Sequence, residues 1–179
     1  AAYDAGAREF GENYVQEAAD KRAELSDLRD ARWHLIGHLQ SNKAALAQRT
    51  FDTIQTLDSA RLASTIARIR PVPPMPVLIE INLGAEASKS GVLAREAEAL
   101  IDAARDKVEL IGLMTIPPHS DDPRGYFAQL RVLRDRLAAS SGLALSELSM
   151  GMTEDFEVAI EEGATIVRVG RAVFGERRS

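Results

Sequence analysis

Along almost the whole chain, short apolar runs alternate with longer amphipathic segments. The apolar runs predict seven strands at residues 8–11, 32–37, 53–57, 76–83, 108–116, 145–150 and 165–170. The amphipathic segments predict helices at residues 13–25, 41–48, 60–69, 94–106, 125–140 and 155–162. Strands and helices that alternate in this way form βα units with a parallel sheet. We therefore predict an α/β fold in one domain over residues 1–179, because no linker divides the chain.

The ends of the predicted strands distinguish two architectures of this class. An open doubly wound sheet binds its ligand at one switch point, whereas a closed (β/α)8 TIM-barrel collects functional residues at the carboxyl ends of its strands. Here nearly every run ends in a polar or glycine-containing cluster, such as residues 11–13, 37–38, 57–59, 149–151 and 168–170. These ends favour the barrel. A barrel usually takes about 250 residues and eight strands, so a chain with seven runs is expected to lack one strand, and its helical opening points to the first.

Composition excludes several classes of protein. The 179 residues contain no cysteine, which excludes disulfide frameworks, thiolate metal sites and cysteine nucleophiles, and favours a cytoplasmic location. No apolar run approaches the roughly 20 residues that a membrane helix needs. The net charge of −5 argues against nonspecific binding of nucleic acid or of an anionic membrane. Small-molecule ligands remain the expected partners.

The last two strand ends are the best candidates for binding phosphate, since barrels often bind it with the loops after strands seven and eight. The loop 149–153 offers the Ser149 hydroxyl and a glycine, and Thr153 is placed to cap the following helix, whose first amides can receive an anion. The loop 170–175 offers main-chain donors, the cation Arg171 and two glycines. Two ordinary βα turns would have the same pattern, so both interpretations stay open.

Arg168 lies inside the last strand, on the same side as Ile166 and Gly170 and opposite two valines. If the valines face helices, Arg168 faces the barrel interior. A buried guanidinium keeps its charge and needs an acceptor, so we expect either a ligand atom or a structural ion pair beside it.

His34 and His38 have the spacing of two metal ligands on a helix, but the residues around them predict a strand and no third ligand is evident. No metal site is predicted, and His38, at the strand end, is the better candidate for lining a pocket. Lys43 and Lys89 also follow strand ends, where they are loop cations or, alternatively, reactive amines.

Six stretches together resemble the pyridoxal phosphate homeostasis protein family and follow the family's order. They are residues 10–17 (FGENYVQE), 33–43 (WHLIGHLQSNK), 88–91 (SKSG), 112–117 (GLMTIP), 148–153 (LSMGMT) and 167–175 (VRVGRAVFG). The resemblance implies a barrel like the amino-terminal domain of bacterial alanine racemase, without that enzyme's second domain, and bound pyridoxal 5'-phosphate.

The resemblance also implies roles for single residues. Ser149, Gly170 and Arg171 would hold the phosphate, with Met150 and Gly151 in the same loop. Arg168 would approach the pyridine nitrogen, where a cation disfavours protonation and weakens the cofactor as an electron sink. Asn13 and His38 would line the mouth of the barrel.

One family feature lies outside this sequence. The lysine that joins the cofactor covalently sits, in the family, on a first strand upstream of position 1, so we expect a chain truncated at its N-terminus. Two consequences are expected: Lys43 or Lys89 substitutes for that lysine or the cofactor binds noncovalently, and the runs at residues 8–11 and 165–170 become exposed, aggregation-prone edges.

The function that this resemblance implies is a non-catalytic carrier or buffer of pyridoxal phosphate. It would be a cytoplasmic monomer that transiently contacts enzymes dependent on the cofactor, with no role at nucleic acids or membranes. Two alternatives stay open. One is an amino-acid racemase, which needs acid-base groups on both faces of the substrate carbon; the other is a fragment that no longer binds the cofactor.

Overall fold

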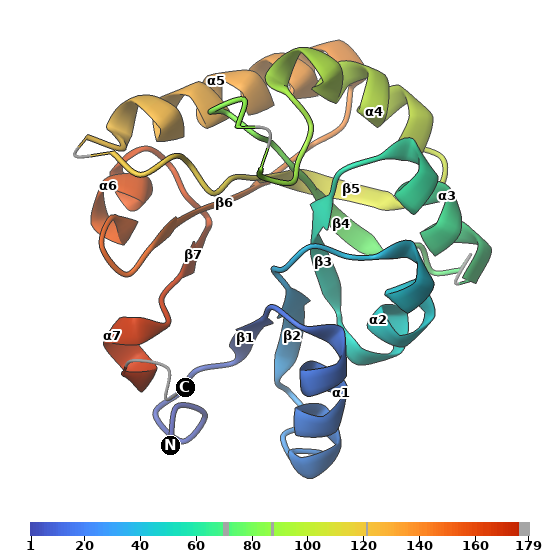
Figure 1. Cartoon of the computed structure of the whole chain (residues 1–179), viewed down its shortest axis with the longest axis vertical. Coiled ribbons are helices and arrows are strands. Elements are labelled where there is room, and N and C mark those ends of the chain that lie inside the picture. The colour runs from blue at the N-terminus through green and yellow to red at the C-terminus, as the bar shows by residue number, and fades with distance from the viewer. Residues whose placement is uncertain (70–71, 87, 121, 176–179) are drawn as a thin grey trace.

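Seven parallel strands curve into a nearly closed barrel in the computed structural model, which describes residues 1–69, 72–86, 88–120 and 122–175 (Figure 1). Each strand pairs with the next one along the chain. The strands are β1 (Glu9–Glu12), β2 (Arg32–Leu35), β3 (Thr53–Leu57), β4 (Pro76–Glu80), β5 (Glu109–Met114), β6 (Glu147–Met152) and β7 (Ile166–Arg168). Each predicted run overlaps one of them, so the predicted α/β barrel is confirmed.

Helices follow the strands and lie on the outside of the ring (Figure 1). They are α1 (Val15–Glu24), α2 (Ala44–Thr50), α3 (Ala60–Ile69), α4 (Ala97–Ala104), α5 (Arg124–Ser141), α6 (Phe156–Glu161) and α7 (Arg171–Phe174), with short 3-10 turns η1 (Ser41–Lys43) and η2 (Ala94–Glu96) before α2 and α4. The six predicted helices are present; the one at residues 60–69 has the predicted ends, and the other five have shifted ends. Helix α7 was not predicted, because four residues are too few to show a period.

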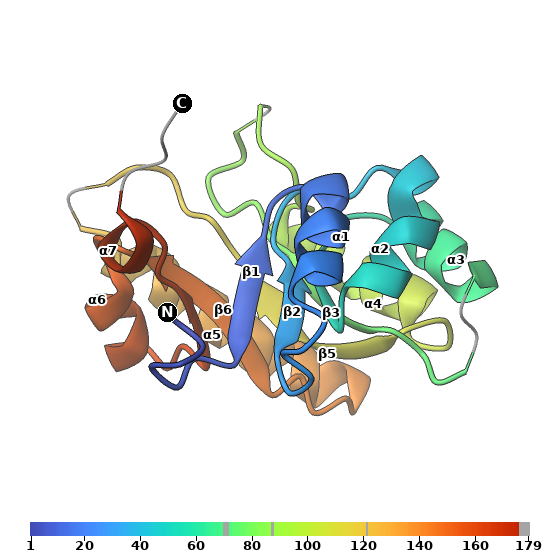
Figure 2. The same cartoon turned by 90° about the horizontal axis from the view of Figure 1, so that it is seen from below.

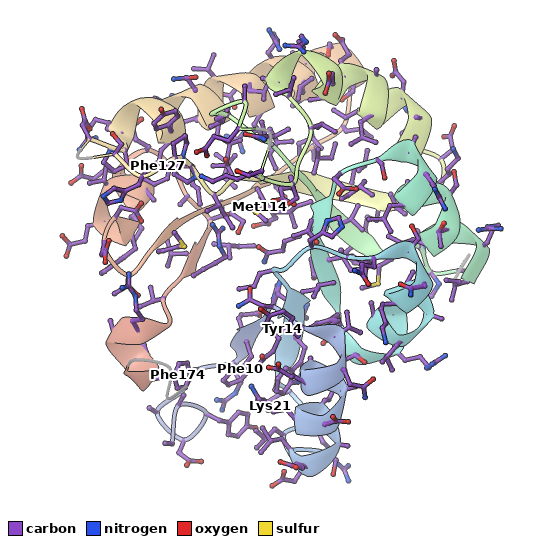
Figure 3. All side chains as sticks on the ribbon, in the orientation of Figure 1. Phe10, Tyr14, Lys21, Met114, Phe127 and Phe174 are labelled. Carbon is purple, nitrogen blue, oxygen red and sulfur yellow. The ribbon has the colours of Figure 1, made fainter. Side chains whose placement is uncertain are left out.

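The core forms where the apolar faces of the helices meet the outer face of the sheet. Helix α5 buries Phe127, Leu130, Leu133 and Leu137, which repeat at the three- and four-residue spacing of one helix face. Phe127 points from α5 toward the strands (Figure 3) and is fully buried. Buried side chains from β2 to β6 and from α1 to α6 belong to one contiguous cluster. That cluster is consistent with one domain over residues 1–179, which stays a prediction.

Strands β1 and β7 are the two edges of the described sheet, as expected for the runs at residues 8–11 and 165–170. Both are short, with four and three residues. On β1 the exposed Glu9 and the half-buried Glu12 carry charge, and Phe10 packs against Trp33 of β2 with ring centroids 5.6 Å apart. Short, charged edges oppose pairing with another chain, so β1 is less apolar than expected. Among the described residues, no helix is both long and apolar enough to cross a bilayer.

Candidate functional site

The carboxyl ends of the strands all point to one end of the barrel. The loops after β4 and β5 and helix α7 rise together at that end (Figure 2). Parallel strands that follow one another around a barrel necessarily bring their carboxyl ends together. The residues predicted to bind the cofactor lie within β6, at the end of β7, or in the loops after β1, β2 and β7, so the fold brings them toward this mouth.

Arg168, the last residue of β7, lies half-buried at this end and makes two hydrogen bonds. Its Nη1 donates to the Ser149 hydroxyl over 2.7 Å, and its Nη2 donates to the Thr115 carbonyl over 2.8 Å. Burial lowers the pKa of Arg168 to about 10, against the opposing attraction of Asp155 and Glu80. The guanidinium is therefore still charged at neutral pH, and neutral acceptors hold it in place of the ion pair considered above.

Ser149 on β6 is fully buried and joins Arg168 to the far wall of the barrel. Its hydroxyl donates to Gln55 Oε1 over 2.6 Å while accepting from Arg168. A hydroxyl has only one hydrogen, so Ser149 has none left for a phosphate in this arrangement. Its predicted contact with the phosphate stays a prediction, and the structure places the hydroxyl inside the barrel.

The next two residues of β6 support the site through packing. The Met150 side chain is fully buried in the hydrophobic core, so only its main chain is available at the strand end. Gly151 has a φ of +90°, and a Cβ there would lie 2.5 Å from the Ala159 Cβ on α6. Gly151 therefore lets α6 pack closely against the strand that carries Ser149.

The loop after β6 differs in detail from the predicted one. Helix α6 begins at Phe156 with Asp155, not Thr153, at its N-cap position, so the predicted cap is wrong. Asp155 Oδ1 instead accepts from the Met152 amide over 2.6 Å, which closes a tight turn around Thr153. The Thr153 side chain, on the first residue after β6, is half-buried.

Gly170 and Arg171 form an exposed turn where β7 leads into α7. A Cβ on Gly170 would meet no other heavy atom within 4 Å, so the space beside this main chain is open. The Gly170 carbonyl accepts from the amides of Val173 and Phe174, while the described residues place no main-chain acceptor on the amides of Gly170 and Arg171. The Arg171 side chain pairs with Glu154 over 2.6 Å, which joins the loops after β6 and β7.

Asn13 and His38 lie at the ends of β1 and β2. The Asn13 side chain is exposed, and its main chain lies against Gly37. His38 is half exposed, with Nδ1 3.2 Å from Asp58 Oδ2. His38 and Asp58 line a cavity of about 400 Å³ together with residues 39–41, 59, 62 and 90–91. His38 thus lies in the lining of a cavity, and its predicted place beside the cofactor stays a prediction.

The two lysines considered as substitutes for the family's lysine have different surroundings. Lys89 is held in its loop, where Nζ lies 3.2 Å from the Pro117 carbonyl and 2.5 Å from Glu86 Oε2. Lys43 is exposed in the turn before α2. Within the described part of the chain, no hydrogen bond or ion pair joins either lysine to Arg168 or Ser149. The described residues also hold no group of three or more His, Asp or Glu side chains placed to bind a metal ion.

Three functional candidates escaped the sequence analysis, namely Gln55, Thr115 and Glu80. Gln55 and Glu80 are polar residues inside apolar strands, and each is more than 90% buried. Ser90 donates to Glu80 Oε1 over 2.7 Å, whereas Oε2 has no partner among the described residues. Burial raises the pKa of the Glu80 carboxyl. A long polar side chain at a buried strand position is the signal that could have identified Gln55 and Glu80, since a buried polar group needs a hydrogen-bond partner.

Comparison with known proteins agrees with this arrangement. Residues 1–178 match the family described as alanine racemase, N-terminal domain. The pyridoxal phosphate homeostasis protein of Aquifex aeolicus is 45% identical over 183 residues, which cover 98% of this chain and 80% of that protein. The chain belongs to the pyridoxal phosphate homeostasis protein family. Another member of this family, from Escherichia coli K12, is 43% identical over 188 residues, covering 98% of this chain and 79% of its own.

Solved structures extend the likeness to the fold. PipY of Synechococcus elongatus, solved without PLP, superposes with a TM-score of 0.91 at 40% identity and covers 97% of this chain and 85% of its own. PipY with PLP bound gives a TM-score of 0.89 at 39% identity, covering 97% and 84%. Alanine racemase of Corynebacterium glutamicum is 20% identical with a TM-score of 0.73, covering 97% of this chain and 49% of that enzyme. The pyridoxal phosphate homeostasis family and the racemase thus share a barrel.

Proposed function

We propose that this protein binds pyridoxal 5'-phosphate at the mouth formed by β6 and β7 and serves as a carrier or buffer of the cofactor without catalysing a reaction. The observation that carries the proposal is the position of Arg168, a charged guanidinium held at the end of β7 beside the open turn of Gly170 and Arg171. The relatives of this protein are named pyridoxal phosphate homeostasis proteins, and PipY has been solved with PLP bound. The proposal includes a cytoplasmic monomer that passes the cofactor to dependent enzymes by transient contact.

The residues present fit a phosphate group. The main chain at Gly170 and Arg171 borders open space, and a side chain at position 170 would project into it. A phosphate that enters this space would accept hydrogen bonds from the amides of the turn and would be attracted by the positive charge of Arg171. Thr153, on the neighbouring loop, has a hydroxyl to add. Gly151 and Met150 would help by fixing the course of that loop, as their packing indicates.

Arg168 would face the pyridine nitrogen of the cofactor. When bound, pyridoxal phosphate supplies an electron sink for reactions at amino groups. A permanent cation beside the nitrogen keeps that nitrogen unprotonated and so weakens the sink. The pKa of about 10 leaves Arg168 protonated at physiological pH. This electrostatic arrangement suits storage of the cofactor better than catalysis.

Racemisation is the alternative activity, and it would need proton-transfer groups on both faces of the substrate carbon. Lys89 is held by Pro117 and Glu86, and Lys43 is exposed in the turn before α2. Arg168 bonds to Ser149 and Thr115, and neither lysine side chain is positioned by it. We therefore expect the protein to leave the optical rotation of L-alanine unchanged in the presence of pyridoxal phosphate.

Gly170→Val tests the proposed phosphate position. The added side chain enters open space and Gly170 has a φ of −107°, so the fold should tolerate it while the phosphate loses its place. Purified protein is mixed with pyridoxal phosphate, desalted and scanned for the absorption band of retained cofactor. Wild type and the control Gly125→Ala, also in open space, should retain the band, and Gly170→Val should lose it with an unchanged melting temperature. Equal retention by Gly170→Val would contradict the proposed position, and no retention by wild type would contradict the proposed function.

A further inference from the structure

A row of polar side chains crosses the barrel from its first strand to its last. Four consecutive hydrogen bonds form it: Arg168 to Ser149 over 2.7 Å, Ser149 to Gln55 over 2.6 Å, Gln55 to His34 over 3.0 Å, and His34 to Glu9 over 2.5 Å. We call these five residues the relay. Gln55 is on β3 and Ser149 on β6, and two strands lie between them in the sheet. Their bond therefore spans the barrel interior rather than joining neighbouring strands.

The direction of each bond in the relay follows from its charged end. A guanidinium can only donate, so Ser149 accepts from Arg168 and gives its single hydrogen to Gln55 Oε1. The Gln55 amide nitrogen then faces His34 Nδ1, which must accept and carries no hydrogen. The hydrogen of neutral His34 is consequently on Nε2, where it is donated to Glu9 Oε2. The relay thus predicts one orientation of the Gln55 amide and one tautomer of His34.

Burying the polar groups of the relay costs free energy unless every one of them has a hydrogen-bond partner. Gln55 is 1% exposed and Ser149 is fully buried, and a buried amide or hydroxyl left unpaired costs about 1 to 3 kcal/mol. Apolar side chains would fill the same space without that risk. Polar groups at these positions therefore indicate a role in orienting what they hold, and the only permanent cation in the relay is Arg168.

We propose that Gln55 and His34 are positioning residues that orient Arg168 toward its ligand through Ser149. The ligand itself rests on the proposed function, in which Arg168 faces the pyridine nitrogen. Without Gln55, the Ser149 hydroxyl is free to turn, and Arg168 loses one of its two fixed acceptors. Thr115 alone then holds one nitrogen of the guanidinium, and the group can rotate.

The first test needs no cofactor. Nitrogen–proton correlation spectra of isotope-labelled protein distinguish the two tautomers of His34 and show whether the Arg168 guanidinium is held rigidly. In wild type we expect the hydrogen on His34 Nε2 and separate signals from the Arg168 amino groups. Gln55→Leu and His34→Leu should each merge the Arg168 signals. Gln48→Leu is the matched control, because Gln48 is also buried but donates to the Ile66 carbonyl, outside the relay.

The second test measures the dissociation constant of pyridoxal phosphate in a double-mutant cycle. Loss of one orienting hydrogen bond should weaken binding about fivefold in Gln55→Leu. In an Arg168→Met background, the same change should alter binding less than about twofold, because a residue that acts through Arg168 has nothing left to orient. A purely structural role for Gln55 would give the same loss in both backgrounds.

The outcomes separate the relay from the proposed function. If wild type binds no pyridoxal phosphate, the proposed function fails, and the spectra still decide the relay. The relay is overturned by a hydrogen on His34 Nδ1, by Arg168 signals that stay separate in Gln55→Leu and His34→Leu, or by additive losses in the cycle. Should Gln55→Leu not fold, His34→Leu takes its place in both tests, because the His34 side chain is partly exposed and lies next to Glu9, the exposed end of the relay.

Discussion

Gly37 lies so close to Asn13 that a Cβ at position 37 would stand 2.8 Å from the Asn13 carbonyl carbon and 2.9 Å from its Cα. The two residues follow β2 and β1, the first two strands of the sheet. Only a residue without a side chain allows the loop after β1 to cross here. This contact holds Asn13 beside His38, which lies next to Gly37 in the chain and lines the cavity.

Gly37→Ala should therefore displace the loop that carries Asn13. We expect a loss of about 3 kcal/mol in the free energy of unfolding, since the clash is with main chain that cannot rotate away. Urea unfolding followed by circular dichroism measures it. The control Gly125→Ala meets nothing within 4 Å and lies in α5, where alanine is the better helix former, so it should gain roughly 0.5 kcal/mol. Similar effects of the two substitutions would contradict the close contact between Gly37 and Asn13.

The burial of Glu80 makes the free energy of unfolding depend on pH and determines the sign of that dependence. Burial raises the pKa of Glu80 in the folded protein, so ionising this carboxyl opposes folding. The penalty is absent below the ordinary carboxyl pKa of about 4.3 and becomes complete once the pH exceeds the raised folded value. Glu80→Gln keeps the acceptor for Ser90 and removes the penalty.

We expect Glu80→Gln to be more stable than wild type near neutral pH, with the difference shrinking to zero as the pH falls to about 4. Urea unfolding at a series of pH values measures the difference. Glu98→Gln, an exposed residue of α4, makes the same charge change without burial and should show no such convergence. A wild type more stable than Glu80→Gln at neutral pH would show that the carboxylate has a stabilising partner.

The strands could be predicted from the sequence because each one is a local apolar run. Residues 53–57 were predicted as a strand and are β3 with the same ends. Gln55, in the middle of that strand, could not be assigned a role, because its partner Ser149 is 94 residues away and belongs to a strand that is not its neighbour. The place of Ser149 near a strand end predicts a phosphate ligand, whereas the direction of its side chain into the barrel depends on the curvature of the sheet. Local patterns contain no information about that curvature.

Arg168→Lys should make cofactor binding depend on pH. Burial lowers the pKa of Arg168 to about 10, so wild type keeps the cation, and its affinity for pyridoxal phosphate should stay level between about pH 7.5 and 9. A lysine at the same place starts from a lower pKa, and the same burial moves it toward neutrality. Its affinity should fall as the pH rises through that range. Titrations at several pH values measure both proteins, and parallel profiles would indicate that the charge at position 168 does not contact the cofactor.

The close packing of Gly151 against Ala159 can be tested by exchanging the two residues, with Gly151→Ala and Ala159→Gly singly and together. Gly151 has a φ of +90°, and a Cβ there would stand 2.5 Å from the Ala159 Cβ, so Gly151→Ala suffers both backbone strain and a clash, together roughly 3 kcal/mol. Ala159→Gly alone should cost about 1 kcal/mol as a glycine in a helix. In the double variant the clash with the Ala159 Cβ is gone, while the strain, the helix cost and a close approach of 3.1 Å to the Phe156 Cα remain. Its loss should therefore be smaller than the sum of the single losses by about 1 kcal/mol or more, measured by urea unfolding. Additive losses would mean that α6 moves away from β6 without resistance, and that Gly151 is required for its backbone conformation alone.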